Sequence, residues 1–355
     1  ISSNSKTSYN GNYGLNASWT LYNGNKRLKT IQQEKLNNQM AELDVATSEN
    51  NIQESITQVY IQILYAAESV KVNENTLQVS IAQRDRGQEL LNAGSIAKSD
   101  LAQLEAQVST DRYQLVTAQA TLEDYKLQLK QLLELDGENE MNIYLPALSD
   151  ENVLAPLPTK KDVYIRALSL RPEIEASKLN VEASELGIGI AKSSYLPTIS
   201  LSAGIGTNHT SGSDFTFGEQ VKNGWNNSIG LSVSVPIFNN RQTKSAVQKA
   251  KLQYETSMLS LLDEQKTLYK TIEGLWLDAN SAQQRYAAAN EKLKSTQISY
   301  ELISEQFNLG MKNTIELLTE KNNLLQAQQE QLQAKYMAIL NMQLLKFYQG
   351  DQLAI

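Results

Sequence analysis

Residues 225–237 read Trp-Asn-Asn-Ser-Ile-Gly-Leu-Ser-Val-Ser-Val-Pro-Ile, and from Ile229 onward every odd position is apolar. The even positions hold mostly small polar side chains or glycine. This two-residue period predicts a β-strand with one apolar and one polar face. The same parity recurs over residues 9–21 and 195–208. Because such strands exceed the usual length of about five or six residues and match the roughly 9–11 that cross a bilayer at a tilt, they are typical of membrane strands around a water-filled lumen.

Aromatic side chains lie near the ends of these strands, where we expect them to form girdles at the two membrane interfaces. The candidates are Tyr13, Trp19, Tyr22, Tyr195, Trp225 and Phe238. A soluble antiparallel sheet with one wet face would give the same alternation, so this alternative stays open. Three strands, or four with one missing, cannot close a barrel, which needs about eight. We therefore expect a barrel shared between chains, with residues 209–224 as its exposed outer loop.

Very long helices are predicted after the strands, because apolar residues then recur at steps of four and three. Over residues 268–307 this stripe consists of Leu268, Ile272, Leu275, Ala279, Ala282, Tyr286, Ala289, Leu293, Thr296, Tyr300, Ile303 and Phe307. It has a counterpart over residues 52–91 and resumes over 101–132. A helix over residues 26–91 would contain about 66 residues and measure roughly 100 Å at 1.5 Å per residue. We expect the helices to pair as antiparallel coiled coils.

An internal repeat organises the chain, since one offset of 216 residues aligns roughly a hundred positions without a gap. At this offset Gly14 matches Gly230, and Gly94 matches Gly310. The repeated unit is predicted to be a strand, a long helix, a glycine turn and a second helix.

The repeat divides the chain into three parts. Residues 1–133 are predicted to form the first repeat, whose N-terminal part is expected to be missing from the sequence. Residues 172–355 form the second repeat, with a helix over about 172–194 and a further strand before the repeated unit. Residues 134–171 contain an Asp-Gly pair and two prolines, and are predicted to be an equatorial linker with little regular structure.

The composition argues against an enzyme and against a nucleic-acid-binding protein. There is no cysteine and one histidine, His209, so thiolate nucleophiles, zinc clusters and Ser-His-Asp catalysis have almost no candidate residues. The formal net charge is −7, with both signs interspersed, whereas binding to nucleic acid requires clustered Lys and Arg. No apolar run reaches the roughly 20 residues of a membrane-spanning helix, so we expect membrane contact through strands or an anchor. We expect no catalytic residue, no cofactor and no metal site.

Four local motifs carry a resemblance to TolC-type outer-membrane efflux proteins. They are the helix start Arg171-Pro172-Glu173, the strand start Tyr195-Leu196-Pro197, and the two helix turns at residues 92–101 and 308–317. In each turn a glycine is followed six residues later by an acidic residue and then by leucine. Together with the order of the elements, the resemblance covers essentially the whole chain.

The resemblance implies an α+β fold: a transmembrane β-barrel shared by three protomers, with four strands from each, that continues into a long antiparallel coiled-coil α-barrel. It implies a homotrimer in the outer membrane of a Gram-negative bacterium, in contact with lipid there and extending into the periplasm. It also implies docking to a periplasmic adaptor protein and an inner-membrane pump. The protein would then be the passive exit duct for small molecules in a tripartite efflux or type I secretion system.

The resemblance also implies a periplasmic gate at the two helix turns, here called the tips. By motif position the gate residues are Ser99, Asp100, Phe307, Lys312, Glu316 and Thr319. The first two would face Phe307 and Lys312 of the other tip. Glu316 would form an acidic constriction ring, and the family's next ring position falls on Thr319, which is not acidic. The residues expected to contact the adaptor are Gly94, Ser95, Gly310 and Met311.

Three alternative interpretations stay open at this stage. The charged tip residues could be ordinary solvated helix ends, because acidic residues are favoured near helix N-termini. The duct could serve metal-ion efflux, because its partner proteins determine which substrate is transported. The chain could instead be a soluble coiled-coil scaffold, which would purify without detergent.

Overall fold

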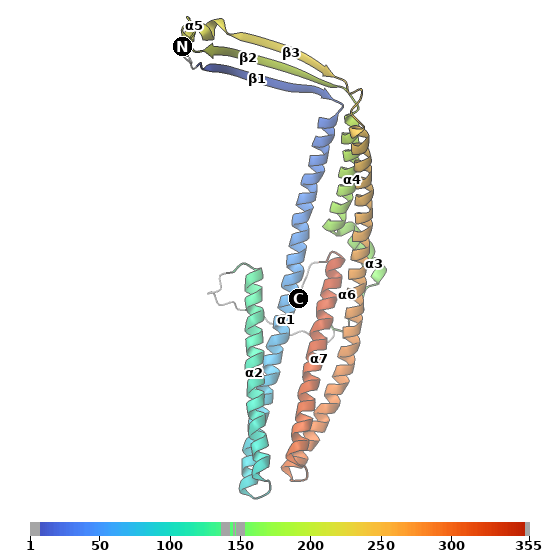
Figure 1. The fold of residues 1–355 in the computed structure, drawn as a ribbon. Coiled ribbons are helices and arrows are strands. Elements are labelled where there is room, and N and C mark those ends of the chain that lie inside the picture. The colour runs from blue at the N-terminus through green and yellow to red at the C-terminus, as the bar shows by residue number, and fades with distance from the viewer. Residues whose placement is uncertain (1–7, 136–142, 145, 147–152, 352–355) are drawn as a thin grey trace. The chain divides into compact units, whose positions relative to one another are not determined.

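The computed structural model describes residues 8–135, 143–144, 146 and 153–351, and it is mostly helical with one sheet (Figure 1). The chain forms two compact units. The sheet unit comprises Ile1–Leu43 and Glu175–Asp263, and the coiled-coil unit comprises Asp44–Ile174 and Glu264–Ile355. Two helices run through both units, α1 (Lys26–Asn92) and α6 (Gln242–Asn308). Each has 67 residues, so each would measure about 100 Å if straight.

The sheet contains β1 (Asn10–Asn23), β2 (Thr198–Thr210) and β3 (Asn226–Ser234), antiparallel in the order β1-β2-β3. Its register places apolar residues opposite one another on all three strands. Ala17 pairs with Ala203 and Ala203 with Ile229, while Trp19, Leu201 and Leu231 form the next row. Because paired residues share a face, the alternation in each strand combines into one apolar face and one polar face across the sheet. The strands predicted at 9–21 and 195–208 are confirmed.

The polar face of the sheet is built from small residues. Ser18 pairs with Ser202 and Ser202 with Gly230, and neighbouring rows hold Asn, Thr, Ser and Gly. No residue of the three described strands carries a Lys, Arg, Asp or Glu side chain. The apolar face is exposed within the single chain, since Leu15 is 71% and Ile229 is 84% exposed.

The structure corrects two predictions at the ends of these strands. The strand predicted at residues 225–237 ends at Ser234, because Pro236 has no N–H to donate to a sheet ladder. The outer loop predicted at 209–224 is partly regular: β2 extends to Thr210, and a short helix, α5 (Phe217–Asn223), follows. A capping box between Thr216 and Glu219 starts α5, and this short Thr-x-x-Glu signal was missed.

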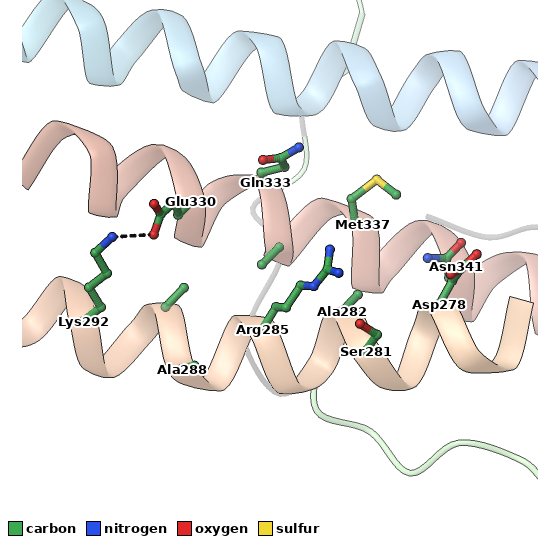
Figure 2. Close-up of a pocket in the computed structure, with 12 residues that line it drawn as sticks. Asp278, Ser281, Ala282, Arg285, Ala288, Lys292, Glu330, Gln333, Met337 and Asn341 are labelled. Atoms are coloured by element: carbon green, nitrogen blue, oxygen red, sulfur yellow. Dashed lines mark hydrogen bonds and ion pairs between the residues drawn. The ribbon is translucent and has the colours of Figure 1, made fainter.

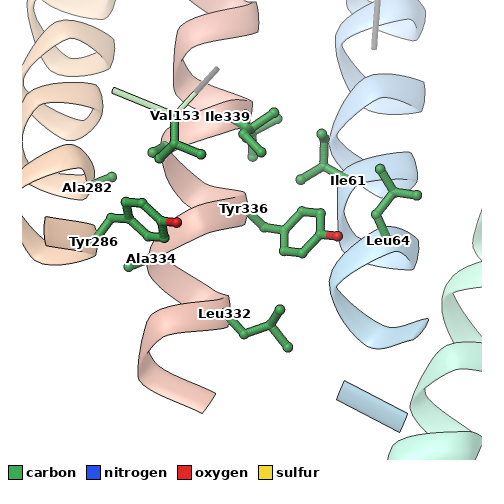
Figure 3. Close-up of a cluster of buried hydrophobic side chains, with 11 residues drawn as sticks. Ile61, Leu64, Val153, Ala282, Tyr286, Leu332, Ala334, Tyr336 and Ile339 are labelled. Atoms are coloured by element: carbon green, nitrogen blue, oxygen red, sulfur yellow. The ribbon is translucent and has the colours of Figure 1, made fainter. Parts of the chain in front are cut away.

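The coiled-coil unit contains the lower parts of α1 and α6 in Figure 1, together with α2 (Lys98–Leu132) and α7 (Thr314–Tyr348). Glycine turns join α1 to α2 and α6 to α7. Helix α7 lies between α1 and α6, and one buried cluster draws side chains from all three helices (Figure 3). Ile61 of α1, Tyr286 of α6 and Tyr336 of α7 are each at most 3% exposed. On the stripe predicted over residues 268–307, Ile272, Tyr286 and Phe307 are each at most 3% exposed, so this stripe consists of packing positions.

The structure also corrects the linker prediction for residues 134–171, of which 136–142, 145 and 147–152 lie outside the described residues. An 11-residue helix, α3 (Lys160–Leu170), occupies the C-terminal part. Thr159 caps it by accepting a hydrogen bond from the backbone N–H of Asp162. Val163 and Ala167, one turn apart, are fully buried against α6 and α7. Two apolar positions with helical spacing were too weak a signal beside the neighbouring prolines.

Arg171 fixes the junction between α3 and α4 (Pro172–Ser193). Its guanidinium donates to Glu54 of α1 at 2.7 Å and lies 3.7 Å from the centre of the Tyr348 ring. The side chain is 7% exposed, so its charge is compensated inside the unit. The Arg-Pro-Glu motif thus ties the start of α4 to the interior of α1 and to the end of α7, while Pro172 occupies a first helical position that needs no N–H.

Among the described residues, no helix is both long and apolar enough to span a membrane. The bounds of α1 and α6 differ by 216 residues at both ends, and so do those of α2 and α7.

Candidate functional site

The tips are built alike, around one glycine each. Gly94 and Gly310 both have a φ of +72°, a conformation that side chains with a Cβ rarely adopt. Nothing lies within 4 Å of the position a Cβ would occupy, so the backbone angle alone calls for glycine. The N–H of Gly94 bonds to Leu91, and that of Ser95 reaches back to Leu90 at 2.8 Å. These bonds close the end of α1 in a Schellman motif, and α6 ends in the same way at Gly310 and Met311.

At the first tip, Asp100 stabilises the start of α2. Its carboxylate accepts a hydrogen bond from the backbone N–H of Ala97 at 3.0 Å. Ala97 has no side-chain oxygen to cap the helix, so this contact from the third residue of α2 is the charged half of the cap. The position also places a negative charge at the positive end of the helix dipole. Ser99, the neighbouring gate candidate, is exposed.

At the second tip, Glu316 forms three hydrogen bonds with two residues. It forms a reciprocal capping box with Asn313, whose side chain accepts from the N–H of Glu316 at 2.9 Å. Its other carboxylate oxygen accepts from the Nζ of Lys312 at 2.5 Å. The hydrogen bond from Lys312, followed by that from the Asn313 backbone, lowers the pKa of Glu316 below its ordinary value. Two predicted gate residues, Lys312 and Glu316, are therefore brought together within one tip.

The structure does not bring together the other predicted gate residues. Among the residues described, no ion pair joins Asp100 to Lys312, and each is engaged within its own tip. Phe307 is only 3% exposed, so it packs inside the coiled-coil unit of its own chain. Thr319 is exposed and its hydroxyl donates to the Ile315 carbonyl one turn back. The contact between opposite tips stays a prediction about the assembled protein.

The second tip presents an apolar surface. Leu309 is 75%, Met311 is 70% and Ile315 is 63% exposed, all within seven residues of chain. At the first tip the equivalent positions, 216 residues earlier, hold the small residues Ala93, Ser95 and Ser99, all exposed. An exposed apolar group at the end of a coiled coil is suited to contact with another protein.

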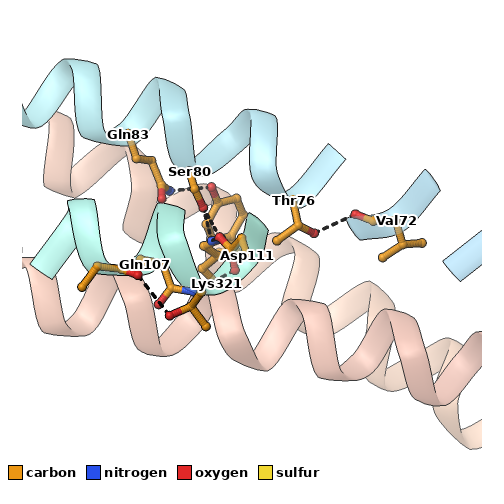
Figure 4. Close-up of polar contacts among 10 residues, drawn as sticks. Val72, Thr76, Ser80, Gln83, Gln107, Asp111 and Lys321 are labelled. Atoms are coloured by element: carbon orange, nitrogen blue, oxygen red, sulfur yellow. Dashed lines mark hydrogen bonds and ion pairs between the residues drawn. The ribbon is translucent and has the colours of Figure 1, made fainter. Parts of the chain in front are cut away.

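A buried polar network connects three helices above the tips (Figure 4). Lys321 of α7 donates to Asp111 of α2 and to Ser80 of α1, and Ser80 in turn donates to Asp111. The Lys321 and Asp111 side chains are 3% and 2% exposed. Gln107 satisfies the second carboxylate oxygen of Asp111 at 2.9 Å. Burial lowers the pKa of Lys321, and the hydrogen bond to Asp111 opposes this shift.

Sequence reasoning found only part of this network. Ser80 and Asp111 lie on the stripes predicted over residues 52–91 and 101–132, but no stripe was predicted that includes Lys321. The available signal was a charged residue on a stripe of α7 between two buried apolar positions, Leu317 and Leu324. Asp111 is 11 residues beyond Asp100, or roughly 16 Å along α2.

A surface groove of about 550 Å³ lies between α6 and α7 (Figure 2). Small residues such as Ala282 and Ala289 form its floor, and Arg285 stands on its α6 side. Lys292 and Glu330 form an ion pair across it at 2.7 Å. The pair is more than one-third exposed on both sides, so it contributes little to stability by itself.

The aromatic candidates of the sheet unit fall into two groups by register. Tyr13 pairs with Thr207 near one end of the sheet, where Trp225 immediately precedes β3. At the opposite end Tyr22 pairs with Ile199, Tyr195 precedes β2 and Phe238 follows β3. Trp19 lies further in, opposite Leu201, and all six are exposed.

Residues 163–350, more than half of the chain, match the family described as outer membrane efflux protein. The chain belongs to this family. The curated relatives of this outer membrane efflux protein include BepC, an outer membrane efflux protein of Brucella suis, at 24% identity over 295 residues, which cover 82% of this chain and 62% of BepC. The outer membrane protein TolC of Escherichia coli is 24% identical over 291 residues, covering 79% of this chain and 58% of TolC. The chain thus spans less than two-thirds of either relative.

Solved structures agree on the fold of this family member. The crystal structure of CusC superimposes with a TM-score of 0.82 over 99% of this chain and 80% of that chain, at 19% sequence identity. The arrangement of long helices and sheet described above is therefore the fold of an outer-membrane channel protein.

Proposed function

We propose that this protein is an exit duct of the outer membrane of a Gram-negative bacterium, through which small molecules leave passively as part of a tripartite efflux or type I secretion system. The observation that carries the proposal is the sheet. An exposed apolar face in register on three strands, opposite a face of small uncharged polar residues, suits lipid on one side and water on the other. In a soluble scaffold we would expect the apolar face that includes Leu15 and Ile229 to be covered. No catalytic step is required for this function.

The proposed assembly is a homotrimer. Three strands have two unpaired edges, and a membrane sheet without closure would expose unsatisfied backbone groups to lipid. We propose that three protomers with four strands each close one barrel, and that their coiled coils continue as an α-barrel in the periplasm. Tyr13 and Trp225 would form one aromatic girdle, with Tyr22, Tyr195 and Phe238 in the other. Trp19 would lie on the lipid side between them.

The tips are proposed as the gate and as the docking site. In the closed trimer, Asp100 and Ser99 of one tip face Lys312 of the other tip, whereas Phe307 stays buried in its own chain. Glu316 narrows the opening with one carboxylate per protomer, and the uncharged Thr319 holds the next position of the constriction. Exposed links of this kind contribute about 0–1 kcal/mol each, so a partner can break them. A periplasmic adaptor bound to an inner-membrane pump would contact Gly94, Ser95, Gly310 and the exposed Met311.

The decisive experiment is single-channel conductance of the full-length protein in planar bilayers. Asp100→Ala with Lys312→Ala should raise a small, stable conductance several-fold. Asp100→Asn with Lys312→Ala is the matched variant, because asparagine keeps an acceptor for the Ala97 N–H while removing the charge. If both double variants open the channel, the charge holds the gate; if only the alanine variant does, the cause is a frayed helix start.

Two further outcomes separate the function from the gate. If the protein conducts but none of the tip variants changes its conductance, the result would support the proposed duct and contradict the proposed gate. A protein that never inserts into a bilayer and purifies without detergent would overturn the duct in favour of a scaffold.

A further inference from the structure

Basic side chains gather at one end of the sheet unit, where α1, α4 and α6 reach the sheet (Figure 1). One row of paired residues, Asn23, Thr198 and Ser234, closes the three strands at this end. The end of α4 contacts the start of α1 there, because a Cβ on Gly24 would lie 2.8 Å from the Ser193 carbonyl oxygen. Six basic residues, at most ten positions from this row, form what is here called the basic collar: Lys26, Arg27, Lys29, Lys192, Arg241 and Lys244.

No carboxylate of the chain balances the basic collar. The segments 20–33, 186–200 and 234–254 contain no Asp or Glu, although the whole chain has 39 of them and a formal net charge of −7. Lys29 is half-buried, and the other five collar residues are exposed. In the part of the chain that the structure describes, every ion pair lies outside the collar. The collar is therefore a patch of uncompensated positive charge on an acidic protein.

The position of these cations also opposes the helix dipole. The N-terminus of a helix carries positive partial charge, so acidic residues stabilise it and basic residues do not. Helices α2, α3, α5 and α7 each have an acidic residue in the first turn, whereas α1 and α6 have none. Instead α1 begins with Lys26 and Arg27, and Arg241 immediately precedes α6. Positive side chains beside two positive helix ends call for a negatively charged partner from outside the chain.

The surroundings of the basic collar favour a lipid surface as this partner. The exposed rings of Tyr22, Tyr195 and Phe238 lie at the same end of the sheet. Arg27 turns back toward them, since its Nη1 donates to the Thr20 carbonyl of β1 at 3.5 Å. An apolar face, then aromatic rings, then cations is the order that matches the hydrocarbon core, the interface and the charged headgroups of a bilayer.

We propose that the basic collar binds the phosphate groups of acidic phospholipids, such as phosphatidylglycerol, in the leaflet that faces the periplasm. Each guanidinium, at Arg27 and Arg241, can hold one phosphate through two parallel N–H donors, and the lysines add point charges. The headgroup layer extends about 5–8 Å beyond the hydrocarbon core on each side. Lys244, the third residue of α6, lies only about 3–5 Å along the helix from its start, within this layer.

The opposite end of the sheet has no such collar. Asp214 and Glu219 accompany Lys222 in the segment between β2 and β3, so the charges there are mixed. Binding of acidic lipid is therefore confined to one end of the sheet, and it adds an orienting contact to the aromatic rings at that end.

This inference rests on the proposed membrane insertion, and its test reports insertion separately. The full-length protein is reconstituted in vesicles of equal parts phosphatidylcholine and phosphatidylglycerol, with each lipid spin-labelled in turn. Electron paramagnetic resonance then measures the fraction of each lipid that the protein surface immobilises. Phosphatidylglycerol should be enriched over phosphatidylcholine, and raised salt should reduce the enrichment because it screens exposed charges.

Variants locate the binding. Lys26→Gln with Lys244→Gln should lower the enrichment several-fold, whereas Lys26→Arg with Lys244→Arg should retain it. Lys266→Gln with Lys270→Gln is the matched control, because it removes two exposed lysines of α6 that lie about 36 Å or more beyond the start of the helix. The control should leave the enrichment unchanged, and an equal loss in both glutamine variants would overturn the collar in favour of net charge.

The remaining outcomes separate the collar from the duct. If both lipids are immobilised equally by the unmodified protein, the collar is overturned and the proposed duct stands. If no lipid is immobilised, the protein does not enter bilayers, which overturns the duct and the collar together. If Lys26→Gln with Lys244→Gln shifts the reversal potential of the channel but not the lipid enrichment, these side chains line the lumen and the lipid contact is overturned. Retention on isolated peptidoglycan without lipid enrichment would likewise overturn it.

Discussion

At the scale of single residues, the charged side chains of this protein follow two different rules. Lys321 and Asp111 are almost fully buried and satisfy one another, whereas Lys312 and Glu316 remain partly in water. A buried ion pair adds little net stability over an apolar pair, but the loss of one partner strands the other charge. An exposed ion pair can break and form again with little change in the free energy of unfolding. The first arrangement holds helices together, and the second can be rearranged.

The buried pair leads to a first prediction. Asp111→Ala should lower the free energy of unfolding of the helices by about 3–5 kcal/mol, because Lys321 would be left buried without a carboxylate. Asp111→Leu with Lys321→Met removes both charges at similar volume and should be close to the unmodified protein. Thermal unfolding followed by far-ultraviolet circular dichroism measures both variants. Equal losses in the two variants would show that packing, not charge compensation, dominates here.

The tip carboxylate leads to a second prediction, about pH. The folded pKa of Glu316 lies below its ordinary value of 4.5, mainly because Lys312 donates to it. Its contribution to the second tip is therefore complete above pH 4.5 and is lost as the pH falls through the lowered folded pKa. A carboxyl ¹³C titration of Glu316 should show the lowered midpoint, and Lys312→Met should move it upward. An unchanged midpoint in that variant would contradict the assigned cause.

At the scale of secondary-structure elements, the sequence predicts those strands and helices in which apolar residues recur regularly over many positions. The strands follow from alternation, and α1 and α6 follow from heptad stripes with glycine at their ends; the predicted helix over 26–91 is α1, which ends one residue later. Helix α3 could not be predicted, because Val163 and Ala167 are buried by α6 and α7, more than about a hundred residues away in sequence. The contact of Lys321 with Asp111 could not be predicted for the same reason, because it depends on how three separate helices pack together.

The sheet gives a third prediction at this scale. Ile229 lies on the apolar face in the middle of β3, and Ser228 beside it lies on the polar face. Ile229→Lys should destabilise the membrane-inserted protein by about 2–4 kcal/mol, as a cation facing the centre of a bilayer does. Ser228→Lys should leave insertion nearly unchanged, because its side chain faces the proposed lumen. Urea unfolding in lipid vesicles separates the two, and a reversed order would invert the assignment of the faces.

At the scale of the whole molecule, the single chain leaves surfaces uncovered that folded proteins usually bury. Among the described residues, the sheet has an exposed apolar face and two edges without a paired strand, and α2 buries four residues where α7 buries fourteen. Each of these features is completed by the trimer proposed here. The single chain therefore contains only part of the interactions that stabilise the functional protein.

A fourth prediction follows at this scale. The unfolding midpoint should rise with protein concentration, because folding and association are linked when subunits complete one another. Thermal unfolding in detergent at concentrations about a hundredfold apart measures this dependence. A midpoint that does not move with concentration would show that the chain is stable alone.

The uncharged strands have an electrical consequence. Side chains that carry no formal charge cannot favour one sign of permeant ion, so the part of the duct lined by β1, β2 and β3 should act as a neutral aqueous resistor. In the proposed trimer, any preference for potassium over chloride then originates in the helical part, where Glu316 would be repeated once in each protomer. The reversal potential in a salt gradient should accordingly shift toward zero in Glu316→Gln and remain unchanged when Ser228 or Ser202 is exchanged for threonine.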